Sequence, residues 1–171
     1  MRVSYGVVAV LALWLGFLIV LVSLILNPAN AALSIPDPHI TPGALNPAVT
    51  QATIDKTICV AGYSAKIRPP ASWTNALKKK QMVDYGFASS WKMSDVEEDH
   101  AIAISLGGAP KDARNLWPQP WYGPHGAKKK DVLENYLHRQ VCAHRMTLKS
   151  AQGAIMPDWV SYCVAHANLN C

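Results

Sequence analysis

Three features are missing from this sequence of 171 residues, and each absence argues against a class of protein. No segment repeats at a fixed period, which argues against a solenoid or a propeller. No two cysteines have C-x-x-C spacing, so a structural zinc site of the common kind is not expected. No charged residue occurs between residues 7 and 26. The chain therefore divides into an apolar amino-terminal segment and a mixed remainder.

The apolar segment, residues 7–26, is long enough to cross a membrane. As a helix it would be about 30 Å long, which matches the hydrocarbon core of a bilayer. This length favours a transmembrane anchor, whereas Ala29-Asn30-Ala31 resembles the cleavage site of a signal peptide, and both interpretations stay open for residues 1–32. Arg2 is the only charge before the segment, so the positive-inside rule predicts that everything after it is extracytoplasmic, either membrane-anchored or secreted.

Proline is frequent in the next stretch. Four prolines occur between residues 36 and 47 without a periodic apolar pattern, which predicts an extended linker over residues 33–50. Residues 51–171 then supply about 120 residues, enough for one domain with a modest core. We expect this domain to be a monomer.

Basic residues exceed acidic ones only slightly in the exported part. After residue 30 there are 15 Lys and Arg (16 less Arg2) against 11 Asp and Glu, a net charge of +4. Lysine triplets at residues 78–80 and 128–130 would follow a phosphate backbone if they fold onto one face, and would otherwise be ordinary solvated surface. The predicted phosphate-binding residues are Arg114, Lys128, Lys129 and Lys130.

A predicted β-hairpin brings two polar side chains together. Apolar residues alternate with small ones over residues 102–106, the period of a half-buried strand, and Gly107-Gly108 permits a reversal. The returning strand covers residues 114–117 and is ended by the two prolines at 118 and 120. His100 and Asn115 would then lie close in space, although 15 positions separate them in sequence.

The remaining elements follow from periodicity and capping residues. Residues 57–66 predict a strand, and the acidic stretch 92–99 predicts a loop. Three helices are predicted, one from Ser72 or Thr74 to Tyr85, one over residues 126–142 with an apolar face, and one over residues 147–155. Pro157 either kinks the third helix or begins a short final one.

Several motifs in this region, taken together, resemble the HNH, or ββα-metal, nucleases. The matching pairs are Asp99-His100, Gly107-Gly108 and Asn115-Leu116, followed by a helix. The longer pattern, DH…LGGAP…RNLWPQP and then KD.LEN.LH..VC, is similar to a small exported bacterial branch of that superfamily, from about residue 58 to about residue 159. The resemblance implies an α+β fold whose core is a ββα-metal hairpin and helix with flanking helices.

The resemblance also implies roles for the site residues. A neutral imidazole can take a proton from water near neutral pH, which makes His100 the expected general base. Asp99 is the expected ligand of one divalent ion, Mg²⁺ by preference with Mn²⁺ or Zn²⁺ as alternatives, which stabilises charge on the phosphate. We expect Asp99 at or before the first residue of its strand, because neighbours within a strand point to opposite faces. Asn115 is expected to fix the hairpin and to orient His100 through its amide oxygen.

The second metal ligand is expected on the helix at residues 126–142. Many HNH nucleases use a histidine there, and this chain has none at the usual spacing after Asn115. Asp131, Asn135 and His138 form one stripe with Glu134 beside it, and each also has the alternative of a solvated polar face. Asn135 is the first choice. Outside the helix, His125 is a candidate replacement ligand, and Trp117 and Trp121 either stack on bases or pack in the core and loops.

All four cysteines lie in the exported part, which indicates disulfides in an oxidising compartment. Four cysteines permit three pairings. We expect Cys59–Cys142 with Cys163–Cys171; the first would take the place of the zinc brace that many HNH proteins contain.

Two classes of function follow. The first is a metal-dependent endonuclease of low sequence specificity that hydrolyses DNA, with RNA as an alternative substrate. The second is a catalytically inactive ββα-like module that binds nucleic acid or the cell envelope. In either case the partners are nucleic acid, mainly DNA, and a membrane through residues 7–26 if these are not cleaved.

Overall fold

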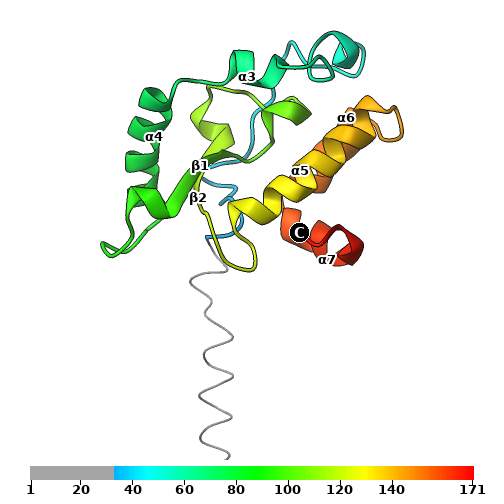
Figure 1. Ribbon diagram of the computed structural model, residues 1–171. Coiled ribbons are helices and arrows are strands. Elements are labelled where there is room, and N and C mark those ends of the chain that lie inside the picture. Colours follow the sequence, from blue (N-terminus) through cyan, green and yellow to red (C-terminus); the bar gives the residue numbers. More distant parts are fainter. Residues whose placement is uncertain (1–32) are drawn as a thin grey trace, which may run out of the picture. The chain divides into compact units, whose positions relative to one another are not determined.

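Two short antiparallel strands and five α-helices form the secondary structure of residues 33–171, the part of the chain that the computed structural model describes. The strands are β1 (Val96–His100) and β2 (Leu116–Pro120). The helices are α3 (Tyr63–Ile67), α4 (Ala71–Asp84), α5 (Ala127–Cys142), α6 (Leu148–Ile155) and α7 (Trp159–Ala165). The predicted α+β class is confirmed. Helix α4 lies on one side of the hairpin, and α5 with α6 and α7 on the other (Figure 1).

No helix within residues 33–171 is long and apolar enough to cross a membrane. The anchor or signal peptide predicted for residues 7–26 lies outside the described residues.

The first strand lies earlier in the chain than the sequence predicted. Residues 102–106, expected as a strand, include a 3-10 turn (Ile104–Leu106), and the expected loop 92–99 contains most of β1. The alternation of apolar residues did not mark a half-buried strand here, because residues 101–104 are all buried and none of them faces solvent. Gly107 has the expected positive φ, +80°, but it ends the 3-10 turn instead of a two-residue hairpin loop.

Both prolines predicted to end the second strand are part of β2. Ala101 N donates to Asn115 O at one end of the ladder, and Trp121 N donates to Asp95 O at the other. Hydrogen-bonded pairs alternate along an antiparallel ladder, so the register makes Glu98↔Pro118 and Val96↔Pro120 pairs without backbone bonds. Each proline therefore stands at a position where the ladder requires no backbone N–H donor.

Helix α4 ends as predicted. Tyr85 is its C-cap, and Gly86 follows with a φ of +69°. At the other end Pro70 is the N-cap, not Ser72 or Thr74 as expected. The helix contacts both strands, and the buried Gln81 joins it to β2 because its Nε2 donates to Leu116 O at 2.8 Å.

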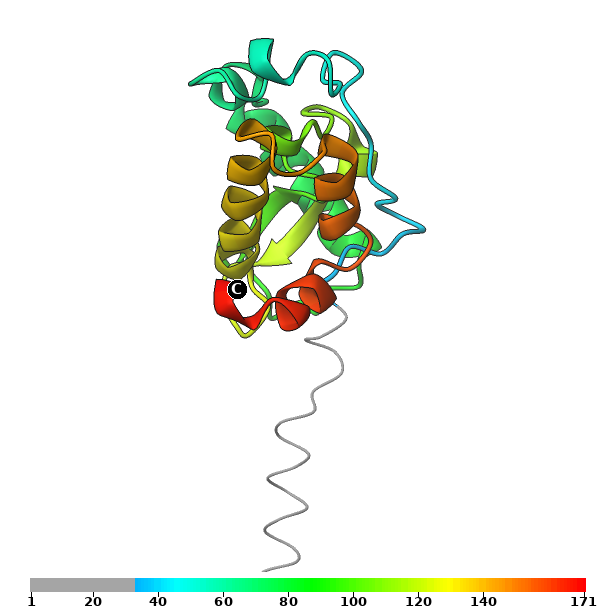
Figure 2. The same cartoon turned by 90° about the vertical axis from the view of Figure 1, so that its right-hand side faces the viewer.

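Helices α5 and α6 match the predicted ranges closely, with Gly126 and Thr147 at their N-caps. The main core lies between α5, α6, α7 and the loop after β1, and α7 packs across the ends of α5 and α6 (Figure 2). Leu133, Leu137 and Val141 supply the buried face of α5. Pro157 belongs to neither helix, because it precedes Asp158, the N-cap of α7.

The predicted linker is packed against the domain. Residues 33–50 belong to the same unit as the rest, Leu33–Cys171, and Thr41 is fully buried. Backbone bonds run from Gly43 N to Arg114 O and from Asn46 N to Gly107 O. Proline removes donors without preventing an extended segment from bonding through its other residues, which is why composition alone was misleading. The strand predicted at residues 57–66 is also wrong, since turns and α3 occupy it.

Both disulfides form with the expected partners. Cys59–Cys142 closes a separation of 83 residues and ties the segment before α3 to the end of α5, and Cys163–Cys171 closes 8 residues. Two disulfides are typical of a protein that folds in an oxidising environment.

Candidate active site around His100

Asn115 fixes the loop that follows β1. Its side chain is fully buried; Oδ1 accepts from Ile102 N at 2.9 Å, and Nδ2 donates to Ile102 O and to Ala109 O. Gly108 lies directly beside this network, because a Cβ there would stand 1.7 Å from Ile102 O. The side-chain amide of Asn115 therefore hydrogen-bonds the backbone N–H and C=O of Ile102, which would otherwise be free to extend the strand.

His100 is the last residue of β1 and is 2% exposed. Its Nε2 lies 3.0 Å from Pro110 O. A carbonyl only accepts, so Nε2 carries the proton and the neutral ring has its lone pair on Nδ1. The carbonyl of Pro110 thus orients this ring, a role that the sequence had assigned to Asn115. Burial lowers the pKa of His100, against the opposing effects of the Pro110 bond and the charge of Asp99, so the imidazole is neutral at neutral pH.

Asp99 is the fourth residue of β1, not a residue at or before its start. Side chains alternate along a strand, so Asp99 and His100 point to opposite faces. The carboxylate of Asp99 faces α5, where its Oδ2 lies 2.7 Å from Lys130 Nζ. The imidazole of His100 lines a pocket whose other walls include α4.

Lys130 is at the centre of a buried ionic cluster. The side chain is 1% exposed, and its ammonium donates to Asp99 Oδ2, to His100 O at 2.7 Å and to Glu134 Oε1. All three N–H donors therefore have acceptors. Burial alone would lower the pKa of Lys130, but the carboxylates of Asp99 and Glu134 raise it, so the ammonium stays charged. The predicted phosphate-binding role of Lys130 is wrong, because its charge is inside the protein.

The remaining predicted ligands on α5 do not converge on Asp99. Asn135, the first choice, is exposed, since it lies about 100° round the helix from Glu134. Asp131 is also exposed. His138 turns toward the segment before α3, where its Nε2 lies 2.9 Å from Ile58 O. Glu134 shares the ammonium of Lys130 with Asp99. Asp131 is near enough that burial and then the charge of Asp99 raise its pKa, but it makes no contact with this ammonium.

These residues do not fit the divalent ion that the resemblance implies. Among the His, Cys, Asp and Glu side chains of residues 33–171, three ligand atoms come within 4.8 Å of one another only at Cys59, His138 and Cys142. This group could hold a metal ion, but its two sulfurs are joined to each other in a disulfide. Thiolates are the metal-binding form of cysteine, so binding there requires reduction.

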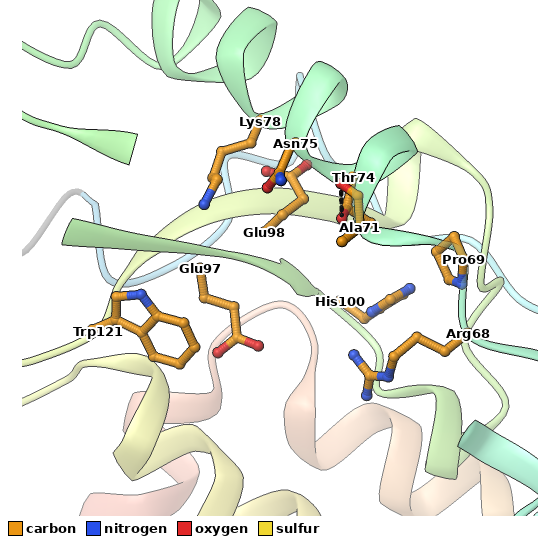
Figure 3. Close-up of a pocket in the computed structure, with 10 residues that line it drawn as sticks. All are labelled: Arg68, Pro69, Ala71, Thr74, Asn75, Lys78, Glu97, Glu98, His100 and Trp121. Carbon is orange, nitrogen blue, oxygen red and sulfur yellow. Dashed lines mark hydrogen bonds between the residues drawn. The ribbon is translucent and has the colours of Figure 1, made fainter. Parts of the chain in front are cut away.

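A pocket of about 270 Å³ extends along β1 from the α4 side to the α5 side (Figure 3). Glu98, Lys78 and Asn75 lie on one side of the strand, and Glu97 and Trp121 on the other. Arg68, the residue directly after α3, extends its guanidinium into the region beside His100. Within the described part of the chain, Arg68 makes no salt bridge.

Two glutamates in this pocket hold their protons unusually tightly. Burial, followed by the negative charge of Asp99, raises the pKa of Glu97 to about 7. Burial raises the pKa of Glu98 to about 8, although the charge of Lys78 opposes it. Glu98 is 8% exposed, and neither of its carboxyl oxygens has a hydrogen-bond partner among the described residues. At neutral pH the positive charges of Arg68 and Lys78 therefore outweigh the carboxylates that line this pocket.

The other predicted contact residues lie on the surface or in the core. Arg114 is exposed and pairs with Asp112. Lys129 Nζ donates to Asn170 O, and the ammonium of Lys128 lies 5.5 Å from the ring centre of Trp121. Trp117 is fully buried against Tyr85, and the ring of His125 meets Trp159 edge-on. Packing, not base stacking, accounts for Trp117.

Arg68 and Glu98 were not predicted as site residues, and Lys130 was predicted in a different role. The spacing of Lys130 and Glu134 at i and i+4 was the available signal for an ion pair on α5. For Arg68 and Glu98 no local signal existed, because the pocket that joins them depends on how α3, α4 and β1 assemble.

Comparison with known proteins finds no match: no family model, no curated protein and no solved structure is significantly similar to this chain. The functional conclusion therefore depends on the site itself.

Proposed function

We propose that the protein is an HNH-like endonuclease that hydrolyses phosphodiester bonds of DNA, with RNA as an alternative substrate, and with low sequence specificity. The observation that carries the proposal is His100, a neutral imidazole at the wall of a pocket, oriented by one carbonyl and with an unprotonated Nδ1. Such a nitrogen accepts a proton from the attacking water. Extracytoplasmic action as a monomer, after export through residues 7–26, belongs to the same proposal.

The charge of the pocket suits a phosphate. Arg68 and Lys78 line it, and Glu97 and Glu98 bind protons more strongly than ordinary carboxyls. A guanidinium without a competing salt bridge is available for bidentate contact with phosphate oxygens. Substrate binding in this proposal depends on these side chains, and no step passes through an ion at Asp99.

The first test uses the purified full-length chain in a non-ionic detergent with supercoiled plasmid. The proposal expects conversion to nicked and linear DNA in at least one of four conditions: Mg²⁺, Mn²⁺, Zn²⁺ or EDTA. His100→Ala should lose the activity, and the matched control His39→Ala, at an exposed position, should keep it. An intact plasmid in every condition would contradict the proposal.

A second candidate function is a nucleic-acid-binding module without catalysis. The buried cluster of Asp99, Lys130 and Glu134 favours it, because a lysine holds the carboxylates that the resemblance assigns to a metal. The two candidates differ in one outcome. The binding module retards DNA in an electrophoretic mobility assay in EDTA and never cleaves it, whereas the nuclease does both.

A further inference from the structure

We propose that the ammonium of Lys130 stands where the resemblance to HNH nucleases places a metal ion, so that hydrolysis at His100 needs no divalent cation, and that Arg68 supplies the charge which stabilises the phosphate. This inference rests on the proposed function and specifies its cofactor requirement and a further catalytic residue.

The first support is the direction of the side chains on β1. An ion that serves both Asp99 and His100 requires the two side chains on one side of the strand. Both residues lie within the regular ladder, paired with Trp117 and Leu116, so their side chains diverge. An ion bound by Asp99 would face Lys130 on α5. Asp99 is not among the residues that line the pocket at His100, although Glu97, on the same face of β1 as Asp99, is one of them.

The second support is the way in which the cluster is filled. Asp99 Oδ2, His100 O and Glu134 Oε1 surround one positive charge, as oxygen ligands surround a hard cation. That charge belongs to Lys130, which is 1% exposed. Burial raises the pKa of Glu134 to about 7, so the negative charge around the ammonium varies near neutral pH. All three ammonium hydrogens are used. A divalent ion could enter only if this side chain left its buried position.

Lys130 therefore acts as a positioning residue. Its bond to His100 O fixes the backbone that carries the imidazole, but no hydrogen of the ammonium remains for a phosphate. Charge on the phosphate must be stabilised from elsewhere. Two cations, Arg68 and Lys78, line the pocket. Lys78 already donates to Met93 O and Val96 O, so Arg68 is the cation that is available to the phosphate.

The balance of the reaction is simple. Water loses a proton to Nδ1 of His100 as its oxygen bonds to phosphorus, and the bond from phosphorus to the leaving oxygen breaks. The leaving oxygen takes a proton from solvent. Arg68 offers two parallel N–H donors to the phosphate oxygens, which gain charge during the step. No oxidant, reductant or metal appears on either side.

The decisive experiment measures plasmid hydrolysis by the wild-type full-length chain in EDTA and in Mg²⁺. The inference predicts rates within about twofold, whereas loss of a charge-stabilising metal ion would slow the reaction by about a hundredfold or more. Hydrolysis only with a divalent ion would overturn this inference and leave the proposed function standing. No hydrolysis in any condition would instead overturn the proposed function and this inference with it.

Variants of Arg68 test its role in stabilising the phosphate. Arg68→Ala should slow hydrolysis by about a hundredfold, with partial recovery in Arg68→Lys and no change in the exposed control Arg139→Ala. An unchanged rate in Arg68→Ala would remove Arg68 from the mechanism.

The replacement of the ion by Lys130 has a readout independent of activity. Lys130→Ala frees the carboxylates of Asp99 and Glu134, so calorimetric titration with Mn²⁺ should show binding at least about tenfold tighter than in the wild type. A folded Lys130→Ala chain that binds Mn²⁺ no better would show that the cluster is not a cation site. If that variant does not fold, the EDTA comparison decides alone, because it needs no substitution.

Discussion

The buried carboxyl of Glu98 should make the stability of the protein depend on pH. Its pKa is raised from an ordinary value of 4.5 to about 8 because burial disfavours the charged form more than Lys78 favours it. An acid with a raised pKa gives stability that is fully present below the unfolded value. That stability is lost as the pH rises through the folded value. The free energy of unfolding should therefore fall between about pH 4.5 and about pH 8.

The size of the effect follows from the shift. Each pKa unit corresponds to about 1.4 kcal/mol, so a rise from 4.5 to about 8 gives an upper limit of about 5 kcal/mol. Relaxation of the surrounding protein when the carboxyl ionises reduces this value. Glu98→Gln keeps the shape and removes the ionisation, so it should gain stability over the wild type as the pH rises.

Urea denaturation of wild type and Glu98→Gln at about pH 5 and about pH 9 measures this gain. We expect the difference in unfolding free energy between the two proteins to shift in favour of the variant by roughly 2–4 kcal/mol over that interval. Asp84→Asn is the matched control, since it removes an exposed acid whose ion-pair partner is a lysine, Lys80, and not a histidine. A difference that stays constant with pH, or an equal shift in the control, would refute the account of Glu98.

Further predictions concern the supports of the site. Replacing Cys59 and Cys142 by serine should lower the free energy of unfolding by about 4 kcal/mol, because the disulfide closes 83 residues, and thermal denaturation should show a larger loss than removal of the 8-residue carboxyl-terminal disulfide. Asn115→Ala should cost about 3 kcal/mol or more in urea denaturation, since two buried backbone groups and one partly buried group lose their partner, and a cost below about 1 kcal/mol would contradict this. Glu134→Gln should destabilise the protein by about 2 kcal/mol while Asn135→Ala changes it by less than about 0.5 kcal/mol, and the reverse order would show that the helix faces the other way.

Helices with a local sequence signal were predictable, and segments whose structure depends on distant contacts were not. The apolar stripe of α5 and the cap at Thr147 gave α5 and α6 nearly to the residue, because burial of one helix face and local capping act within the element itself. Strand β1 carries three acids in five residues, so its pattern resembles a loop. Its pairing with β2 and the cover from α4 and α5 override that composition.

The site shows the same division. The pairing of a histidine with an asparagine across the hairpin was correct as a proximity, because Asn115 binds the backbone of Ile102 just after His100. The directions of the side chains around β1 and α5 decide which carbonyl orients His100. They also decide which helix residue meets Asp99. A shift of one residue on a helix turns a side chain by about 100°, which separates Asn135 from Glu134. Sequence spacing cannot fix that angle before the packing is known.

The most direct test of the central claim is the rate at which His100→Ala hydrolyses a labelled DNA duplex. Loss of a general base reduces the rate by about 10²–10⁴-fold, while the fold and DNA affinity of the variant should match those of the wild type. The control His39→Ala should hydrolyse the duplex at the wild-type rate. A His100→Ala protein that retains more than about a tenth of the wild-type rate would contradict the assignment of this pocket as the active site.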